Sequence, residues 1–190
     1  MPNRPDQTRP VQALIFDFDG TLVDSDEALL IPLERLGIDR ADVVMGSAVA
    51  EECERLGISM ESYVDLYDED SVEPFPGVAE VIPKLSRWAL CSNKHPRSGA
   101  AELARLAWEP EIALFADHFG WAHKGIGPVL ELMGLEADDV VMVGDSDGDV
   151  RCAEEVGCAF AWAGWNPRVR ERSPVGTVLD QPSDLLDLYG

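Results

Sequence analysis

The sequence contains little positive charge and no long hydrophobic run. Lys and Arg together number 15 against 36 Asp and Glu, which gives a formal net charge of −21. An acidic surface of this kind repels nucleic acids and anionic membranes, so we expect neither as a partner. No apolar run approaches the roughly 20 residues that span a bilayer, and residues 1–10 lack the apolar core of a signal peptide. We therefore expect a cytoplasmic protein with a flexible tail over residues 1–10.

Cysteine is also scarce, and its spacing excludes a zinc site or a redox motif. The four cysteines, at positions 53, 91, 152 and 158, form no CxxC pair and no Cys/His cluster. Two of them lie in apolar runs that are typical of buried strands. We interpret all four as reduced thiols of a cytosolic protein.

Short apolar runs alternate with amphipathic segments along most of the 190 residues. We expect strands at residues 11–16, 88–91, 140–143 and 158–163, a shorter one at 118–121 and an edge strand at 175–179. We expect helices at residues 96–107, 128–133, 150–156 and 183–188. This alternation predicts βαβ units, and hence an α/β fold: a Rossmann-like parallel sheet of about five strands with helices on both faces.

Residues 24–75 interrupt the alternation. They contain three helical stretches, at 26–36, 41–56 and 60–68, and no convincing strand. We expect them to form a small helical cap inserted after the first strand, so that residues 11–23 and 76–190 make up the core.

Acidic residues follow two of the predicted strands. Asp17 and Asp19 come directly after the first, and Asp145 follows the strand at 140–143, with Asp149 one turn into the next helix. Ligands of parallel sheets bind outside the carboxyl ends of the strands, so these side chains are expected to converge. Crowded carboxylates repel one another, and a divalent cation relieves the repulsion. Oxygen-only ligands favour Mg²⁺ over Zn²⁺.

A second group of polar residues is suited to holding phosphate. Ser92 and Asn93 follow the strand expected at residues 88–91, and Lys124 follows the short strand expected at residues 118–121. A hydroxyl, an amide, an ammonium and the N–H groups of the following helix can all bind phosphate oxygens. Lys94 and Arg97 could assist, or could be surface charges. Each residue alone has an ordinary structural explanation, but the ordered set predicts an active site for phosphoryl transfer.

These motifs resemble those of the haloacid dehalogenase-like superfamily. Residues 17–25, DFDGTLVDS, are similar to its first motif, DxDGTLxDS, and residues 144–149, GDSDGD, resemble its fourth, GDSxxD. Residues 92–94, SNK, are similar to the TNK of phosphoglycolate phosphatase-like members, and Lys124 matches the lysine of the third motif. Two features depart from the pattern: Lys124 is followed by glycine instead of proline, and the cap is short.

The resemblance implies a magnesium-dependent phosphatase that acts on a small phosphorylated metabolite of the phosphoglycolate type. It implies that Asp17 attacks phosphorus to form an aspartyl-phosphate and that Asp19 is the general acid and base. The resemblance also implies which residues bind the metal and the phosphoryl group. Asp17, the backbone carbonyl of Asp19, and Asp145 would bind Mg²⁺ with Asp149 behind them, and Ser92, Asn93 and Lys124 would hold the phosphoryl group.

Three alternatives stay open at this point. A dehalogenase uses the nucleophile without a metal, but its motif lacks the second aspartate, so Asp19 argues against it. A sugar phosphomutase would need a cap that holds a sugar while it turns over. A non-catalytic phosphate-binding or regulatory member is disfavoured by the intact acidic set. Residues 24–75 are expected to select the substrate, and either a monomer or a homodimer is compatible with the sequence.

Overall fold

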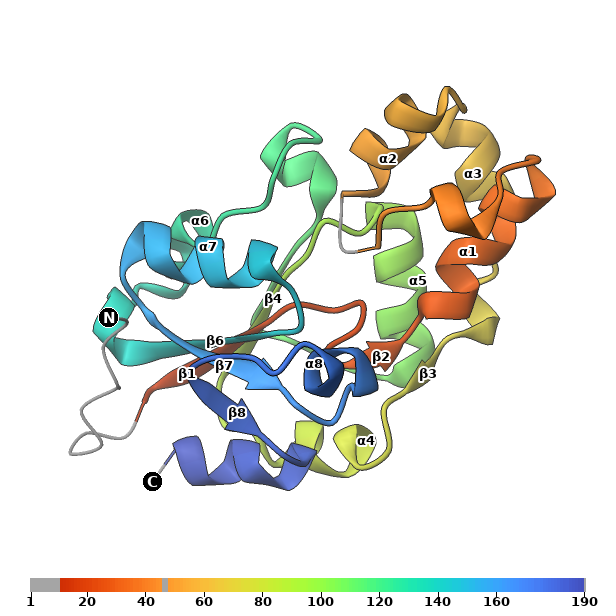
Figure 1. The fold of residues 1–190 in the computed structure, drawn as a ribbon. Coiled ribbons are helices and arrows are strands. Elements are labelled where there is room, and N and C mark those ends of the chain that lie inside the picture. The colour runs from red at the N-terminus through yellow and green to blue at the C-terminus, as the bar shows by residue number, and fades with distance from the viewer. Residues whose placement is uncertain (1–10, 46–47, 190) are drawn as a thin grey trace.

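The computed structural model describes residues 11–45 and 48–189, so the tail expected at residues 1–10 lies outside the described residues. In this part of the chain, no helix has the length and apolar content needed to cross a membrane. Six parallel strands form the central sheet (Figure 1). Their spatial order is β5 (Ile112–Leu114), β4 (Trp88–Cys91), β1 (Ala13–Phe16), β6 (Val140–Gly144), β7 (Ala159–Ala163) and β8 (Thr177–Leu179).

Strand β1 lies at the point where the strand order reverses. Leu14 pairs with Trp88 of β4 on one side and with Val141 of β6 on the other. The chain therefore adds β4 and β5 on one side of β1, and then β6, β7 and β8 on the other side. In sheets of this topology a crevice opens at the carboxyl end of the strands beside the reversal, and ligands bind there.

The side chains of β1 alternate between two hydrophobic layers. Leu14 and Phe16 belong to one buried cluster, and Ala13 and Ile15 belong to the other. One layer is completed by α6 (Gly127–Met133) and α7 (Asp147–Val156). The other is completed by α4 (Val78–Val81), by part of α5 (Pro96–Leu106) and by the C-terminal 3₁₀ helix η6 (Pro182–Leu188). Because both faces of the sheet are covered, the predicted Rossmann-like α/β fold is confirmed, with six strands instead of about five.

The strand expected at residues 118–121 is wrong. Residues Ala116–Phe119 form the 3₁₀ helix η4, and the fifth strand, β5, lies earlier. Trp121 follows a left-handed glycine and itself has φ +65°, with 41% of its surface exposed. Such a backbone cannot continue an extended strand.

Several helices also differ from those expected. The stretch at 41–56 contains a 3₁₀ turn, η1 (Arg40–Asp42), and a separate helix, α2 (Val49–Leu56). The closing helix is 3₁₀ instead of α. Helix α8 (Pro167–Glu171) was not expected at all, although Asn166 accepts a hydrogen bond from the Arg168 N–H as its N-cap.

The segment of residues 24–75, predicted to be a cap, contains α1 (Asp26–Arg35), α2 and α3 (Met60–Leu66), which Figure 1 shows grouped together at one side of the molecule. It is bounded by two short strands, β2 (Val23–Asp24) and β3 (Glu73–Pro74), which pair antiparallel. This ribbon was not expected from the sequence. Tyr63 and Tyr67, from α3 and its end, belong to the same apolar cluster as Phe16, so these helices share a hydrophobic core with the sheet.

Candidate active site

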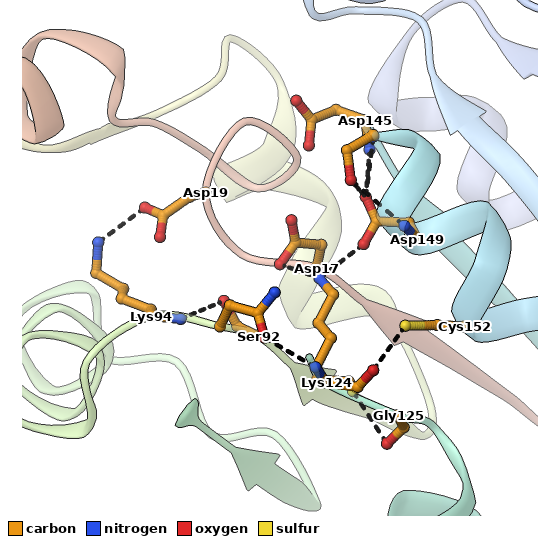
Figure 2. Close-up of polar contacts among 12 residues, drawn as sticks. Asp17, Asp19, Ser92, Lys94, Lys124, Gly125, Asp145, Asp149 and Cys152 are labelled. Carbon is orange, nitrogen blue, oxygen red and sulfur yellow. Dashed lines mark hydrogen bonds and ion pairs between the residues drawn. The ribbon is translucent and has the colours of Figure 1, made fainter. Parts of the chain in front are cut away.

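Asp17 and Lys124 form the centre of the site. The Asp17 N–H donates to the carbonyl of Val143 at 3.0 Å, which fixes the end of β1 against β6. The Nζ of Lys124 lies 2.6 Å from Oδ1 of Asp17 and 2.6 Å from Oδ1 of Asp149 (Figure 2). Lys124 is only 6% exposed. Burial alone would lower the pKa of Lys124, but Asp149 and Asp17 outweigh it and raise the pKa well above its usual value.

Asp149 is held by the start of α7. Its Oδ2 accepts hydrogen bonds from the N–H of Asp145 at 3.1 Å and from the N–H and Oγ–H of Ser146 at 2.9 and 2.7 Å. A Cβ on Gly144 would lie 2.4 Å from Cβ of Asp149, so only glycine allows this approach. One oxygen of Asp149 therefore fixes the turn that carries Asp145, and the other holds Lys124.

Three carboxylates gather at the ends of β1 and β6. Ligand oxygens of Asp17, Asp145 and Asp149 lie within 4.8 Å of one another, and all three residues are buried. Burial raises the pKa of Asp17 to about 6. Burial, together with the charges of Asp17 and Asp149, raises the pKa of Asp145 to about 8. Negative charge is therefore in excess here, and a divalent cation would relieve it, so these hard oxygen donors fit a metal such as Mg²⁺.

Helix α8, which follows β7, brings a cation that the sequence did not single out. The Nη2 atom of Arg168 lies 3.0 Å from Oδ2 of Asp145 and 3.0 Å from Oδ1 of Asp26. Gly20 lies close to the ion pair of Asp145 and Arg168. A Cβ at position 20 would come within 2.5 Å of Asp145 and 2.7 Å of Arg168. Asn166 donates to the Gly20 carbonyl at 2.7 Å. The Asn-Pro pair that opens α8 is a typical helix start and could have located this segment.

Ser92 and Asn93 occupy different positions at the end of β4. Ser92 is buried, and its Oγ accepts from the N–H of Lys94 at 3.3 Å. Oδ1 of Asn93 accepts from the N–H of Lys124 at 2.9 Å. Asn93 therefore fixes the Lys124 loop, and both Ser92 and Asn93 line the cavity that contains Asp17.

Asp19 lies apart from the carboxylate cluster. Its Oδ1 is 2.8 Å from Nζ of Lys94, on the side of Ser92 opposite to Lys124 (Figure 2). Lys94 is 4% exposed, so it is not a surface charge. Arg97, in contrast, is exposed and forms an ion pair of 3.2 Å with Asp65.

A cavity of about 200 Å³ brings these groups together. From the core, Asp17, Asp19, Ser92, Asn93, Lys124 and Asp145 line it; from the insertion, Leu29, Met45, Val49, Tyr63 and Tyr67 line it. Of the predicted site residues, only Asp149 does not line the cavity, which agrees with its place behind Asp145 and Lys124.

Known phosphatases are similar to the chain over most of its length. The chain is 26% identical over 206 residues to the phosphoglycolate phosphatase of Aquifex aeolicus, covering 94% of this chain and 96% of that protein. It is 22% identical over 213 residues to the N-acetylmuramic acid 6-phosphate phosphatase of Pseudomonas aeruginosa, covering 94% of each. A solved structure from Lactobacillus plantarum matches with a TM-score of 0.79 at 22% identity, covering 95% of this chain and all of that one, which shows a shared fold.

The sequence profile of the haloacid dehalogenase-like hydrolases matches residues 32–163, more than half of the chain. This match begins after the first motif, so it is independent of Asp17 and Asp19. It therefore confirms the resemblance first noted in the motifs: the chain belongs to the haloacid dehalogenase-like hydrolase family.

Proposed function

We propose that the protein is a magnesium-dependent phosphatase that hydrolyses a small phosphomonoester through an aspartyl-phosphate on Asp17. The observation that carries the proposal is the bridge from Lys124 to Asp17 and Asp149. Lys124, Asp17 and Asp145 line the same cavity. An ammonium in this position can neutralise a phosphate oxygen and keep the attacking carboxylate ionised.

The first half-reaction transfers the phosphoryl group to the enzyme. A carboxylate oxygen of Asp17 attacks phosphorus, and the bond between phosphorus and the leaving oxygen breaks. Asp19 gives its proton to that oxygen, while Lys124 and Ser92 hold the oxygens of the transferred group, with Asn93 fixing the lysine loop. In the second half-reaction Asp19 takes a proton from water, which attacks phosphorus and releases Asp17 and inorganic phosphate.

The metal would be held by Asp17, Asp145 and the backbone carbonyl of Asp19, with Asp149 behind them. When bound, Mg²⁺ would supply the positive charge that offsets the phosphate oxygens and the crowded carboxylates. Arg168 already places a guanidinium on Asp145, which supports the assignment of this carboxylate as one that requires a cation.

Residues 24–75 are proposed to be the cap that selects the substrate. The described cap residues that line the cavity carry no formal charge. Arg151, on α7 of the core, also lines it and could pair with a second anionic group such as the carboxylate of phosphoglycolate. Relatives named phosphoglycolate phosphatase support this substrate type.

The test is loss of turnover on substitution of Asp17. We expect Asp17→Asn to release no phosphate from p-nitrophenyl phosphate, whereas the exposed control Asp138→Asn keeps normal activity. Beryllium fluoride with Mg²⁺ should stabilise the wild type and the control against heat, but not Asp17→Asn. Turnover by Asp17→Asn would contradict the proposed nucleophile.

The alternatives give different products. A dehalogenase would release no phosphate from p-nitrophenyl phosphate, and release of halide from a haloacid in the presence of EDTA would favour it. A sugar phosphomutase would convert one sugar phosphate to its isomer with little free phosphate. A binding protein would release none from any ester of a panel that includes phosphoglycolate.

A further inference from the structure

A second buried charge network lies next to Asp19, outside the carboxylate cluster. It joins Lys94, which follows β4, to Glu102 in the middle of α5 and to Tyr67 at the end of α3. Nζ of Lys94 lies 2.8 Å from Oδ1 of Asp19, 2.8 Å from the hydroxyl of Tyr67 and 3.0 Å from Oε1 of Glu102. An ammonium has three N–H donors, and these three acceptors use all of them.

The network fixes the ammonium from every side. The hydroxyl of Tyr67 donates to Oε1 of Glu102 at 2.9 Å while it accepts from Lys94. Nζ of Lys94 also lies 4.7 Å from the ring centre of Tyr67 and 5.7 Å from that of Phe18, both within the range of cation–π attraction. Lys94 therefore has one well-defined position, and through it so has Oδ1 of Asp19.

Stability alone does not account for Glu102. Its side chain is fully buried, and within the described residues its Oε2 has no hydrogen-bond partner. A buried carboxylate oxygen without a partner costs free energy that an apolar side chain of similar size would avoid. Glu102 also does not line the active-site cavity, whereas Lys94, Tyr67 and Asp19 do. Any effect of Glu102 on the reaction therefore passes through its partners Lys94 and Tyr67.

We propose that Glu102 is a positioning residue for Asp19. Together with Tyr67 it holds the Lys94 ammonium against Oδ1 of the Asp19 carboxyl group, so that the other oxygen can carry the proton for the leaving group. The inference rests on the proposed function, because it takes Asp19 as the general acid. It adds that Glu102 of α5 and Tyr67 at the end of α3 together hold Asp19 in position.

The test compares two substrates of nearly the same shape. Phenyl phosphate needs a proton on its departing oxygen much more than p-nitrophenyl phosphate does, because nitrophenolate is the more stable anion. The quantity to compare is kcat/KM of the magnesium-loaded enzyme, which reports the reaction only as far as departure of the leaving group. We expect Glu102→Gln to lower kcat/KM about tenfold more for phenyl phosphate than for p-nitrophenyl phosphate.

Two further variants support the comparison. Tyr67→Phe removes the hydroxyl that bonds to both Glu102 and Lys94, and we expect the same preference in the same direction; it also serves if Glu102→Gln does not fold. Glu111→Gln, which breaks a surface ion pair with Arg87 of 2.6 Å far from the cavity, should lower neither value. A purely structural role for Glu102 would lower kcat/KM for both esters equally, and that result would overturn the inference.

Asp19→Asn separates this inference from the function on which it rests. We expect it to discriminate between the two esters more strongly than Glu102→Gln, and the double variant to discriminate no more than Asp19→Asn alone. If Asp19→Asn shows no discrimination, the acid role of Asp19 is wrong and both proposals fall. If it discriminates and both Glu102→Gln and Tyr67→Phe do not, only the role of Glu102 is overturned.

Discussion

The buried position of Glu102 should be visible in the pH dependence of stability. Burial raises the pKa of Glu102 from 4.5 to about 7, because the attraction of Lys94, which lowers the pKa, does not outweigh burial and the negative charge of Asp19. The folded protein therefore binds a proton at Glu102 more tightly than the unfolded chain does. Its contribution to the free energy of unfolding is greatest below pH 4.5 and falls as the pH rises towards 7.

The size of the effect follows from the two pKa values. A shift from 4.5 to about 7 corresponds to a total of about 3 kcal/mol, of which about 2 kcal/mol falls between about pH 5 and about pH 8. Glu102→Gln cannot ionise at this position and lacks the contribution. Relative to wild type, the variant should therefore become more stable by about 2 kcal/mol as the pH is raised across this range.

Urea denaturation in EDTA, followed by tryptophan fluorescence at a series of pH values, measures this difference. Subtracting the variant from the wild type cancels the contributions of Asp17, Asp145 and the other carboxylates, which both proteins share. A difference that stays constant with pH, or that moves in favour of the wild type as pH rises, would refute the reasoning. Such a result would mean that Glu102 is ionised throughout, with Lys94 compensating it fully.

Three further substitutions test the geometry of the site. Gly20→Ala forces a side chain at φ +76° against Asp145 and should cost about 1–3 kcal/mol of stability by urea denaturation; a midpoint equal to wild type would contradict the close approach. Arg168→Gln removes a competing cation from Asp145 and should tighten Mg²⁺ binding about fivefold, or about 1 kcal/mol, by titration calorimetry; weaker binding would show that the guanidinium assists the metal. Cys152→Ala removes the thiol that donates to the carbonyl of Lys124 at 3.0 Å and should cost about 1 kcal/mol more than Cys152→Ser, which keeps a donor; equal losses would show that the hydrogen bond is of no consequence.

The central strands were predictable because they are apolar on both faces. β1, β4 and β6 are fully buried runs of four or five residues, each followed by a polar break. β5 was missed because it has only three residues, two of them half-buried, so its apolar signal is weak. The aromatic residues around 118–121 gave a stronger signal, but there the backbone turns at Gly120 and Trp121.

The site was predictable where the chemistry is carried by sequence motifs. Asp17 and Asp145 follow β1 and β6, which pair at the reversal of strand order, so topology brings these two carboxylates together. Lys124 comes after the edge strand β5 and the 3₁₀ helix η4, and the motif marked it instead. The partners of Lys94 and Arg168 were not predictable. Glu102 is eight residues from Lys94 and lies on an otherwise ordinary helix, and Arg168 reaches Asp145 only because Asn166 ties its loop to the Gly20 carbonyl. Such contacts depend on side-chain directions that periodicity does not encode.

The Lys124 loop shows how a departure from the family motif can be compensated by tertiary contacts. Lys124 is followed by Gly125 instead of the usual proline, which leaves the backbone freer in the unfolded chain and without a fixed φ at that position. Three hydrogen bonds replace this constraint. Asn93 accepts from the N–H of Lys124, and Cys91 donates to the carbonyl of Gly125 at 3.5 Å. Cys152 donates to the carbonyl of Lys124 (Figure 2).

Two of these partners are thiols that were interpreted from the sequence only as reduced cytosolic cysteines. Thiols are weak donors, so neither contact would hold the loop by itself. Together with the amide of Asn93 and the ion pairs of Lys124 with Asp17 and Asp149, they leave the lysine a single buried position. In the usual motif, the proline after the lysine constrains the backbone. Here the contacts with three neighbouring elements orient the lysine instead. For that reason a sequence that departs from the motif at Gly125 still brings the ammonium to the carboxylates.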